Sequence, residues 1–279
     1  MEKKKVVVSG LLAAVVAVSG QFVQVGQERG THFGLQSAAA FGLKVPKIKT
    51  GDSSVDNAVK KSAEQAVGNA LNVDLESMGN RKQDMLKHLA WAARLEAVSA
   101  DRWGKVANVD TANAQAASNS AQSFFANGDF SLPAFKSFHS TIESKMQLTD
   151  AQKKQMTTAF DSLVSDKDKL TTEENKARVT EAKKARKMAA IYNALAARDA
   201  GLLLSDTAKA LSKKADLGDQ LSEVEELAAF AKEAKSFVDF QKKMSKDRAA
   251  MTKKAEKAMN VKEPTEQENK EFAKSLGME

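Results

Sequence analysis

Apolar residues at helical spacing, almost unbroken from Ser53 to the end of the chain, are the feature that most constrains the fold. They recur three and four positions apart, as on one face of an α-helix. Only three prolines occur in the sequence, at positions 46, 133 and 264, so long uninterrupted helices are sterically allowed. The sequence therefore predicts an all-α fold, an elongated bundle of about seven to eight helices.

The chain divides into four expected segments. They are a signal peptide (1–20), an irregular leader (21–52), an N-terminal helical part (53–165) and a C-terminal long-helix part (170–279) packed with it as one bundle. The longest expected helix, 222–259, carries two adjacent apolar stripes, which indicate contact with two neighbouring helices. Its later stripe positions become polar at Gln241 and Arg248, so we expect that end to project or to pack on a partner.

The first twenty residues have the pattern of a secretory signal peptide. Basic Lys3, Lys4 and Lys5 precede an apolar run that is too short to cross a membrane, and small residues follow it. We expect an exported protein, periplasmic or secreted, that is cleaved near Ser19 or Gly20. An uncleaved anchor is the alternative.

Composition narrows the chemistry and the partners. The chain has no cysteine, which excludes disulfides, thiolate metal sites and cysteine nucleophiles. Its net charge of +7 makes it moderately basic. For an exported protein, this charge predicts contact with envelope proteins, anionic polymers or lipid headgroups and not with nucleic acid. A homo-oligomer is also compatible with the pattern.

Catalytic and metal-binding patterns are weak. Asp84 and His88 lie four residues apart, as do His139 and Glu143, so each pair could share a helix face. Such isolated pairs are more typical of surface hydrogen bonds than of metal sites. Glycine-rich phosphate loops and the Gly-x-Ser-x-Gly nucleophile motif are absent from the sequence. We therefore expect no enzyme, no metal site and no cofactor.

Two clusters of basic residues are the candidate partner-binding sites. The first comprises Lys183, Lys184, Arg186 and Lys187, and the second comprises Lys242, Lys243 and Lys246. One interpretation is an ordinary solvated helix surface with screened charges. The other is an electropositive face that attracts an acidic partner.

Near the middle of the chain, Thr149 and Gln152 form a candidate capping box that begins a helix at Thr149. The Thr hydroxyl accepts from the backbone at the third helical position, and the Gln side chain returns the bond. The same spacing recurs three times, at Thr171/Glu174, Ser222/Glu225 and Thr265/Glu268. We interpret the pattern mainly as the way in which this chain begins its helices.

Leu148, Thr149 and Gln152, with Asp150 and Ala151 between, resemble the LTxxQ motif of the periplasmic Spy and CpxP chaperone family. The resemblance covers about ten residues. It implies an exported, all-helical, commonly dimeric protein that presents a basic concave surface with apolar patches to unfolded clients. Family members usually carry two copies in a shorter chain, whereas the second candidate here, 170–174, ends in Glu in place of Gln.

These observations together predict an exported, non-enzymatic helical protein that binds macromolecular partners in the cell envelope in a chaperone-like way. One alternative is a structural or scaffolding protein that self-associates through 222–259 in the manner of a coiled coil. Another is a lipid or hydrophobic-ligand binder in which alanine-lined helices within 55–125 part around a cavity. A hydrolase of unrecognised type is the least favoured hypothesis.

Overall fold

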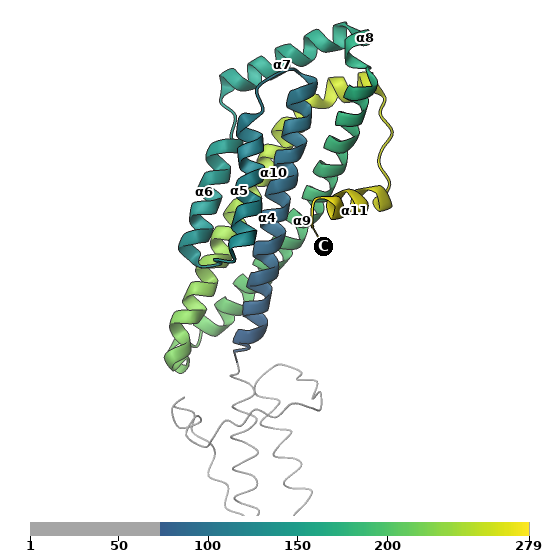
Figure 1. Cartoon of the computed structure of the whole chain (residues 1–279). Helices are drawn as coiled ribbons and strands as arrows, with labels where there is room; N and C mark the ends of the chain where they lie inside the picture. Colours follow the sequence, from purple (N-terminus) through teal and green to yellow (C-terminus); the bar gives the residue numbers. More distant parts are fainter. Residues whose placement is uncertain (1–72, 279) are drawn as a thin grey trace, which may run out of the picture. The chain divides into compact units, whose positions relative to one another are not determined.

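The computed structural model describes residues 73–278, and within them the chain is all-α (Figure 1). This confirms the predicted fold class. The helices are α4 (Leu75–Val106), α5 (Ala112–Asn127), α6 (Leu132–Met146), α7 (Asp150–Ser165), α8 (Lys167–Leu170), α9 (Glu173–Leu211), α10 (Leu221–Met259) and α11 (Glu266–Ser275). The expected signal peptide, leader and first helix lie outside the described residues.

Residues 75–211 and 220–278 form one compact helical unit. Residues 212–219 lie outside this unit. They carry the 3-10 turn Lys214–Asp216 and most of a second one, Gly218–Gln220, where Gly218 adopts a positive φ of 51°. Only a residue without a Cβ adopts this conformation easily, which explains why the helical pattern breaks at Gly218.

Three long helices, α4, α9 and α10, form the centre of the helical unit (Figure 1). An ion pair joins Arg81 near the start of α4 to Asp206 near the end of α9, so these two helices are antiparallel. At the other end, Arg102 Nε donates to Glu181 over 2.5 Å. Helix α10 runs parallel to α4, and Gln241 Nε2 donates to the Leu89 carbonyl over 3.3 Å.

Small side chains allow these three helices to lie close together. The alanines buried to 5% exposure or less include Ala92, Ala93, Ala97 and Ala100 on α4, Ala182, Ala185, Ala189, Ala196 and Ala200 on α9, and Ala231, Ala234 and Ala255 on α10. A methyl group fills little space, so neighbouring backbones approach closely and stay well packed.

Helices α5 and α6 cover this centre through an aromatic cluster. The rings of Phe124 and Phe138 are stacked, with centroids 4.3 Å apart, and Phe138 meets Phe237 of α10 edge-on at 5.4 Å. Phe135 contacts Phe230 and Phe237 on the same helix. Stacked and edge-on pairs of this kind add to the free energy of burial, so the cluster fixes α6 against α10.

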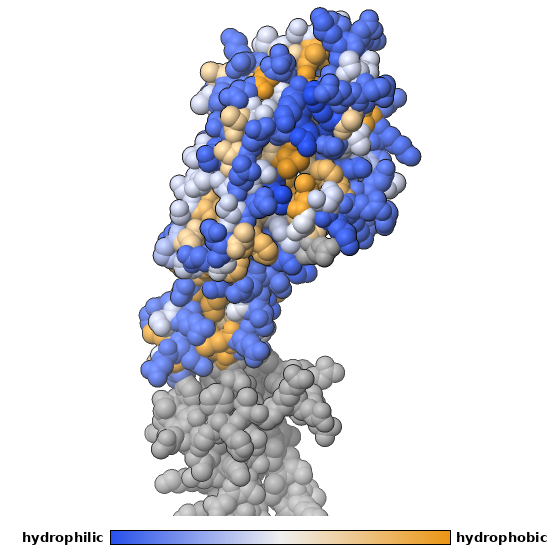
Figure 2. All heavy atoms as spheres, in the orientation of Figure 1, coloured by the Kyte–Doolittle hydropathy of each residue, from blue (hydrophilic) through white to orange (hydrophobic). Residues whose placement is uncertain are grey.

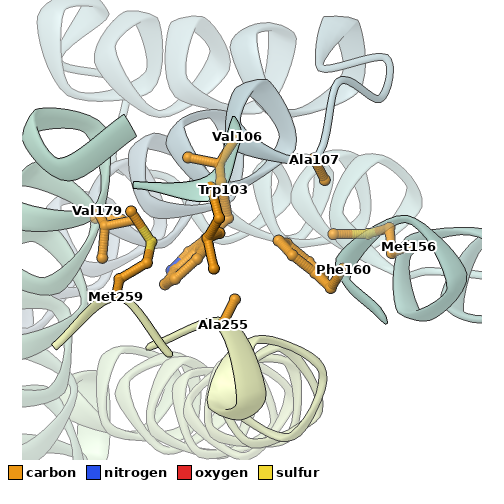
Figure 3. Close-up of a cluster of buried hydrophobic side chains, with 10 residues drawn as sticks. Trp103, Val106, Ala107, Met156, Phe160, Val179, Ala255 and Met259 are labelled. Atoms are coloured by element: carbon orange, nitrogen blue, oxygen red, sulfur yellow. The ribbon is translucent and has the colours of Figure 1, made fainter. Parts of the chain in front are cut away.

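Helices α7 and α8 cross one end of the long helices and close it (Figure 1). Figure 3 shows Trp103 of α4 facing Phe160 of α7, with ring centroids 5.6 Å apart and nearly perpendicular planes. Val179, Ala255 and Met259 complete this cluster from α9 and α10. Trp103 is 3% exposed, so its indole ring is part of the core.

Two of the four expected capping boxes are present. Gln152 N donates to Thr149 Oγ1 over 3.2 Å while Thr149 N donates to Gln152 Oε1 over 2.9 Å, which confirms the predicted start of a helix. Thr265 and Glu268 form the second box, at the start of α11.

The other two expected boxes are wrong. Helix α9 is capped by Thr172, whose hydroxyl accepts from Asn175 N, in place of Thr171. Helix α10 begins at Leu221, so Ser222 is already helical and Gln220 precedes the helix without a side-chain cap. A 3-10 turn leads directly into α10, and this helix therefore has no cap that the sequence motif could reveal.

The expectation that α10 projects near Gln241 and Arg248 is also wrong. Gln241 is 2% exposed, and Arg248 donates to the Met146 carbonyl over 3.0 Å. Both polar side chains stay inside the bundle because backbone carbonyls of α4 and α6 accept their hydrogen bonds.

Replacing Phe160 with alanine should lower the free energy of unfolding by about 3 to 5 kcal/mol, because the loss opens a cavity between α4, α7 and α10. Urea denaturation followed by circular dichroism measures this change. Phe125→Ala is the matched control, since Phe125 is 39% exposed and its loss should cost about 1 kcal/mol or less. Equal losses in the two variants would contradict this closure of the bundle.

Candidate functional site

A basic cavity lies where the lower-numbered half of α9 meets the higher-numbered half of α10. Its volume is about 310 Å³. It is lined by Lys183, Arg186, Lys187, Ala190, Ser245, Lys246, Ala249 and Glu263. We call it the basic cavity. Because α9 and α10 are antiparallel, two clusters about sixty residues apart in the sequence meet at one opening.

The structure brings together four of the seven basic residues that the sequence predicts as partner-binding. Lys183, Arg186 and Lys187 line the cavity from α9, and Lys246 lines it from α10. Lys184, Lys242 and Lys243 do not line it; Lys242 and Lys243 are exposed elsewhere on α10. The cavity therefore contains only part of each sequence cluster. A cluster defined along the sequence also includes lysines that point in other directions around the helix.

The cations of the cavity differ in how they are neutralised. Lys183 is only 8% exposed, and its ammonium donates to Glu263 over 2.8 Å and to the Val261 carbonyl over 3.0 Å. Arg186 pairs with Glu256 at 3.0 Å. Lys187 and Lys246 are exposed and have no ion pair within 4.0 Å among residues 73–278. These two lysines therefore give the mouth of the cavity its uncompensated charge.

Glu263 is a carboxylate of this protein that lies at the basic cavity and contacts its cations. The hydrogen bond from Lys183 holds the pKa of Glu263 below its ordinary value, and the charges of Lys187 and Arg186 act in the same direction. Glu263 lies in the linker between α10 and α11, and its side chain is 73% exposed. The protein thus places one of its own anions at the edge of the cavity, where solvent still reaches it.

The linker leads into α11, which packs on α9 and α4. Ala273 and Met278 are buried against Trp91, Leu95 and Met188. Arg94 donates to the Leu276 carbonyl over 2.6 Å and holds the end of the segment. Figure 2 shows apolar side chains gathered beside α11, with hydrophilic side chains over most of the rest of this face. The apolar contact explains how the linker is kept close to the basic cavity.

A second, larger cavity lies under the same linker. Its volume is about 450 Å³, and Lys176, Thr180, Met259 and Pro264 are among its lining residues. It shares Glu263 with the basic cavity. The linker therefore runs along two hollows. Lys183 holds it by hydrogen bonds, and Val261 packs against the apolar cluster around Trp103.

Glu96 of α4 is a buried carboxyl group. It is 4% exposed, and its Oε1 has no hydrogen-bond partner within the described chain. Burial raises the pKa of Glu96 to about 7, and Ser245, Arg248 and Arg186 oppose this shift. Burial likewise lowers the pKa of Arg248, which Glu96 and Asp247 oppose. Desolvation outweighs attraction for both groups.

Sequence reasoning missed Ser245 as a lining residue of the basic cavity, and it missed the buried position of Glu96. A signal for Glu96 was nevertheless present, because it occupies a stripe position. The buried stripe of α4 runs Leu89, Ala93, Glu96, Ala100 and Trp103, spaced by four and three. A carboxyl group in such a stripe predicts a buried charge that needs cationic partners. No comparable signal marked Ser245.

His88 and His139 each lie close to a carboxylate on another helix. His139 Nδ1 lies 2.6 Å from a carboxylate oxygen of Glu233, and His88 Nδ1 lies 3.4 Å from one of Asp199. Burial lowers the pKa of His88, against the attraction of Asp199. Over the range 73–278, no group of three or more His, Cys, Asp or Glu side chains is placed to hold a metal ion.

Comparisons with protein-family models, with curated proteins and with solved structures found no match for this chain. The LTxxQ resemblance at 148–152 thus stays a prediction. None of the helices in the described part combines the length and the apolar character that a membrane span requires.

Replacing Glu96 with glutamine should make the protein less sensitive to alkaline pH. The unfolded carboxyl group titrates near 4.5 and the folded one near 7, so the native state loses stability as pH rises between these values. Between about pH 5 and about pH 8, the wild type should lose about 3 kcal/mol relative to Glu96→Gln.

Urea denaturation at the two pH values measures this difference. Glu143→Gln is the control, because Glu143 is exposed on α6 and its replacement should leave the pH dependence of the wild type in place. A constant gap between the wild type and Glu96→Gln at both pH values would contradict the buried position of the carboxyl group.

Proposed function

We propose that this chain is an exported, non-enzymatic binding protein whose basic cavity receives a carboxylate-rich segment of an acidic protein in the cell envelope. The observation that carries the proposal is the convergence of four cations from two helices on one cavity. Cations gathered at one opening create a local positive potential that attracts anionic groups and orients them.

Glu263 supports a carboxylate as the occupant. Glu263 belongs to a polypeptide segment of this protein, and its carboxylate already accepts a hydrogen bond from Lys183 at the edge of the cavity. A partner chain with neighbouring acidic side chains would find the same donor and the two uncompensated lysines, Lys187 and Lys246. A protein partner is therefore favoured over a lipid surface or a cell-wall polymer, which remain outcomes of the test.

Export and the chaperone-like role rest on the sequence. The secretory pattern of residues 1–20 supports the envelope as the compartment. The LTxxQ resemblance implies a basic surface that receives unfolded clients, and the basic cavity agrees with this in charge. A chaperone-like role predicts that the protein slows the aggregation of an unfolding client less well as salt concentration rises.

The two alternative functions draw no support from the described residues. Helix α10 buries its apolar stripes against α4, α6, α7 and α9, which leaves no continuous stripe for a two-stranded coiled coil. Ala117 and Ala121 are buried at 0% and 2% exposure on α5, so packing fills this part of the alanine face.

Charge reversal at the mouth of the cavity should weaken binding of poly-L-glutamate. We expect Lys187→Glu combined with Lys246→Glu to raise the Kd about tenfold or more, because both uncompensated cations become anions. Fluorescence anisotropy at two salt concentrations measures the Kd, and the wild-type value should rise with salt.

The matched control is Lys242→Glu combined with Lys243→Glu, which changes the net charge equally at exposed positions outside the cavity. It should change the Kd by less than about threefold. Equal weakening in both double variants would show that the charge of the whole surface, and not the cavity, binds the anion. If the protein bound phosphatidylglycerol vesicles and not poly-L-glutamate, the partner would be a lipid surface and not a protein.

Replacing Glu263 with glutamine should strengthen the same interaction. Glu263 occupies Lys183 in the free protein, so an incoming carboxylate must compete with it. We expect the Kd for poly-L-glutamate to fall about two- to fivefold, which corresponds to the loss of one solvent-exposed ion pair. A higher Kd in Glu263→Gln would mean that Glu263 organises the cavity and does not compete for it.

A further inference from the structure

We infer that helix α11 occupies the docking site of an acidic amphipathic helix from the partner protein, and that this partner helix displaces α11 when it binds. The inference rests on the proposed function and deepens it, because it states which secondary structure the acidic partner presents and where the apolar side of that structure binds. The apolar residues beneath α11 are called the α11 contact surface. They are Trp91, Leu95 and Val98 of α4 and Ala185, Met188, Ala189 and Tyr192 of α9.

The start and the end of α11 are fixed by bonds within the segment itself. At the start, Thr265 and Glu268 form the capping box. At the end, Met278 N donates to the Ala273 carbonyl over 3.2 Å, and Gly277 turns the chain with a positive φ of 73°. This Schellman arrangement brings Met278 beside Ala273. Because these bonds are all local in the sequence, a short segment of another chain can present the same surface.

One side of α11 is apolar and packs on the α11 contact surface. Ala273 and Met278 are 2% and 3% exposed, and Phe272 and Leu276 pack around them. Phe272 and Leu276 lie four positions apart, so they share one helix face. An amphipathic helix that sets anchors of this spacing on an apolar surface is a recurrent form of protein recognition. The contact therefore shows which class of ligand α4 and α9 accept at this place.

The linker and the remaining side of α11 are acidic, in contrast to the chain as a whole, whose net charge is +7. The charged residues between 263 and 278 are Glu263, Glu266, Glu268 and Glu271 against Lys270 and Lys274. This acidic segment lies against the basic stretch 183–187 of α9, where Lys183 pairs with Glu263 at 2.8 Å and Ala185 belongs to the α11 contact surface. Charge complementarity therefore favours an acidic helix as the partner segment.

The fit of α11 is incomplete at two polar atoms. Asn269 of α11 is 1% exposed, and its Oδ1 has no hydrogen-bond partner within residues 73–278. Arg94 of α4 donates from one terminal nitrogen to the Leu276 carbonyl over 2.6 Å, whereas its buried Nε has no partner in the same part of the chain. A buried polar atom without a hydrogen bond weakens the packing that buries it.

These two atoms define how a partner helix would bind more tightly than α11 does. An apolar side chain in place of Asn269 would leave no buried amide oxygen unpaired. A carboxylate near the end of the partner helix could accept from both Nε and a terminal nitrogen of Arg94, which is a stronger contact than a single carbonyl provides.

The short linker 260–265 makes α11 a competitor of any partner helix. A short tether holds its ligand at an effective concentration on the order of millimolar. The apparent Kd of a partner helix is therefore raised by the ratio of docked to free α11. Release of α11 should remove this competition. The freed helix has only 10 residues, so it should lose its helical structure in solution.

A fluorescein-labelled peptide of residues 263–278 that carries Asn269→Leu is the probe, and fluorescence anisotropy with the full-length protein measures its Kd. In the protein, Ala273→Asp places a charge on the apolar side of α11 and so releases α11, while the α11 contact surface keeps its side chains. We expect this variant to bind the peptide about fivefold more tightly than the wild type, or better.

Gln267→Asp in the protein is the matched control. It adds the same charge at an exposed position of α11, so the Kd of the peptide should change by less than about twofold. A second control is the peptide with Ala273→Asp, which keeps the acidic character but loses the apolar side. This peptide should bind at least about tenfold more weakly to every variant.

Hydrogen exchange of the wild type tests displacement without any substitution in the protein. A saturating amount of the peptide should speed exchange of the amides of α11, because the displaced helix unfolds, and should leave the centre of α10 unchanged. This measurement does not depend on whether Ala273→Asp folds.

The outcomes separate this inference from the proposed function. If poly-L-glutamate binds the wild type but the peptide binds neither the wild type nor Ala273→Asp, the inference is overturned and the basic cavity remains the partner site. If neither ligand binds, both proposals are overturned. Equal binding of the peptide to the wild type and to Ala273→Asp, with α11 still protected from exchange, would place the peptide on another surface and overturn displacement.

A second copy of this chain is the remaining occupant that the experiment distinguishes. Light scattering at rising protein concentration would detect dimers that form by exchange of α11, and the peptide would dissociate them. That result would assign the α11 contact surface to α11 of a second copy and overturn a separate partner. A wild type that stays monomeric while it binds the peptide supports the inference.

Discussion

The close approach of α4, α9 and α10 along their alanine faces is the constraint on which the rest of the structure depends. Methyl side chains at the seam leave little space between the backbones, so polar side chains within it, such as Glu96 and Gln241, are almost fully removed from water. Burial in this seam raises the pKa of Glu96 and lowers the pKa of Arg248. The same antiparallel pairing of α9 and α10 places Lys183, Arg186 and Lys187 of α9 and Lys246 of α10 around one opening.

The linker after α10 is exposed but is bonded to a side chain from the interior of the bundle. Lys183 has a stem buried between helices and an ammonium group that holds the linker through Val261 and Glu263. Helix α11 adds apolar contacts with α4 and α9, and Arg94 fixes its last turn. The C-terminal segment is thus held by a charged contact at one end and an apolar contact at the other, and these respond differently to salt.

Much of the fold could be predicted from the sequence, because the residues that form and begin a helix lie close together in the chain. The period of apolar residues gives the helices, and Thr149 with Gln152 marks the start of α7. The failures arose where tertiary contacts decide. Gln241 and Arg248 are inside because distant carbonyls accept their hydrogen bonds, and His139 finds Glu233 ninety-four residues away. For the site, the sequence identified its cations but not their convergence, since which lysines face one another depends on the relative rotation of α9 and α10.

The aromatic contact between α6 and α10 also bears on how the chain is made. Phe135 and Phe138 pack on Phe230 and Phe237, which are translated about a hundred residues later. Until then only Phe124 of α5 covers the aromatic side of α6, the part that faces α10 is uncovered, and α4 has not yet packed against α9. Contacts of such large sequence separation delay burial, and exposed rings promote association between chains in the meantime. During synthesis, apolar surfaces of the first half of this bundle therefore stay uncovered until the second half has been made and packs against them.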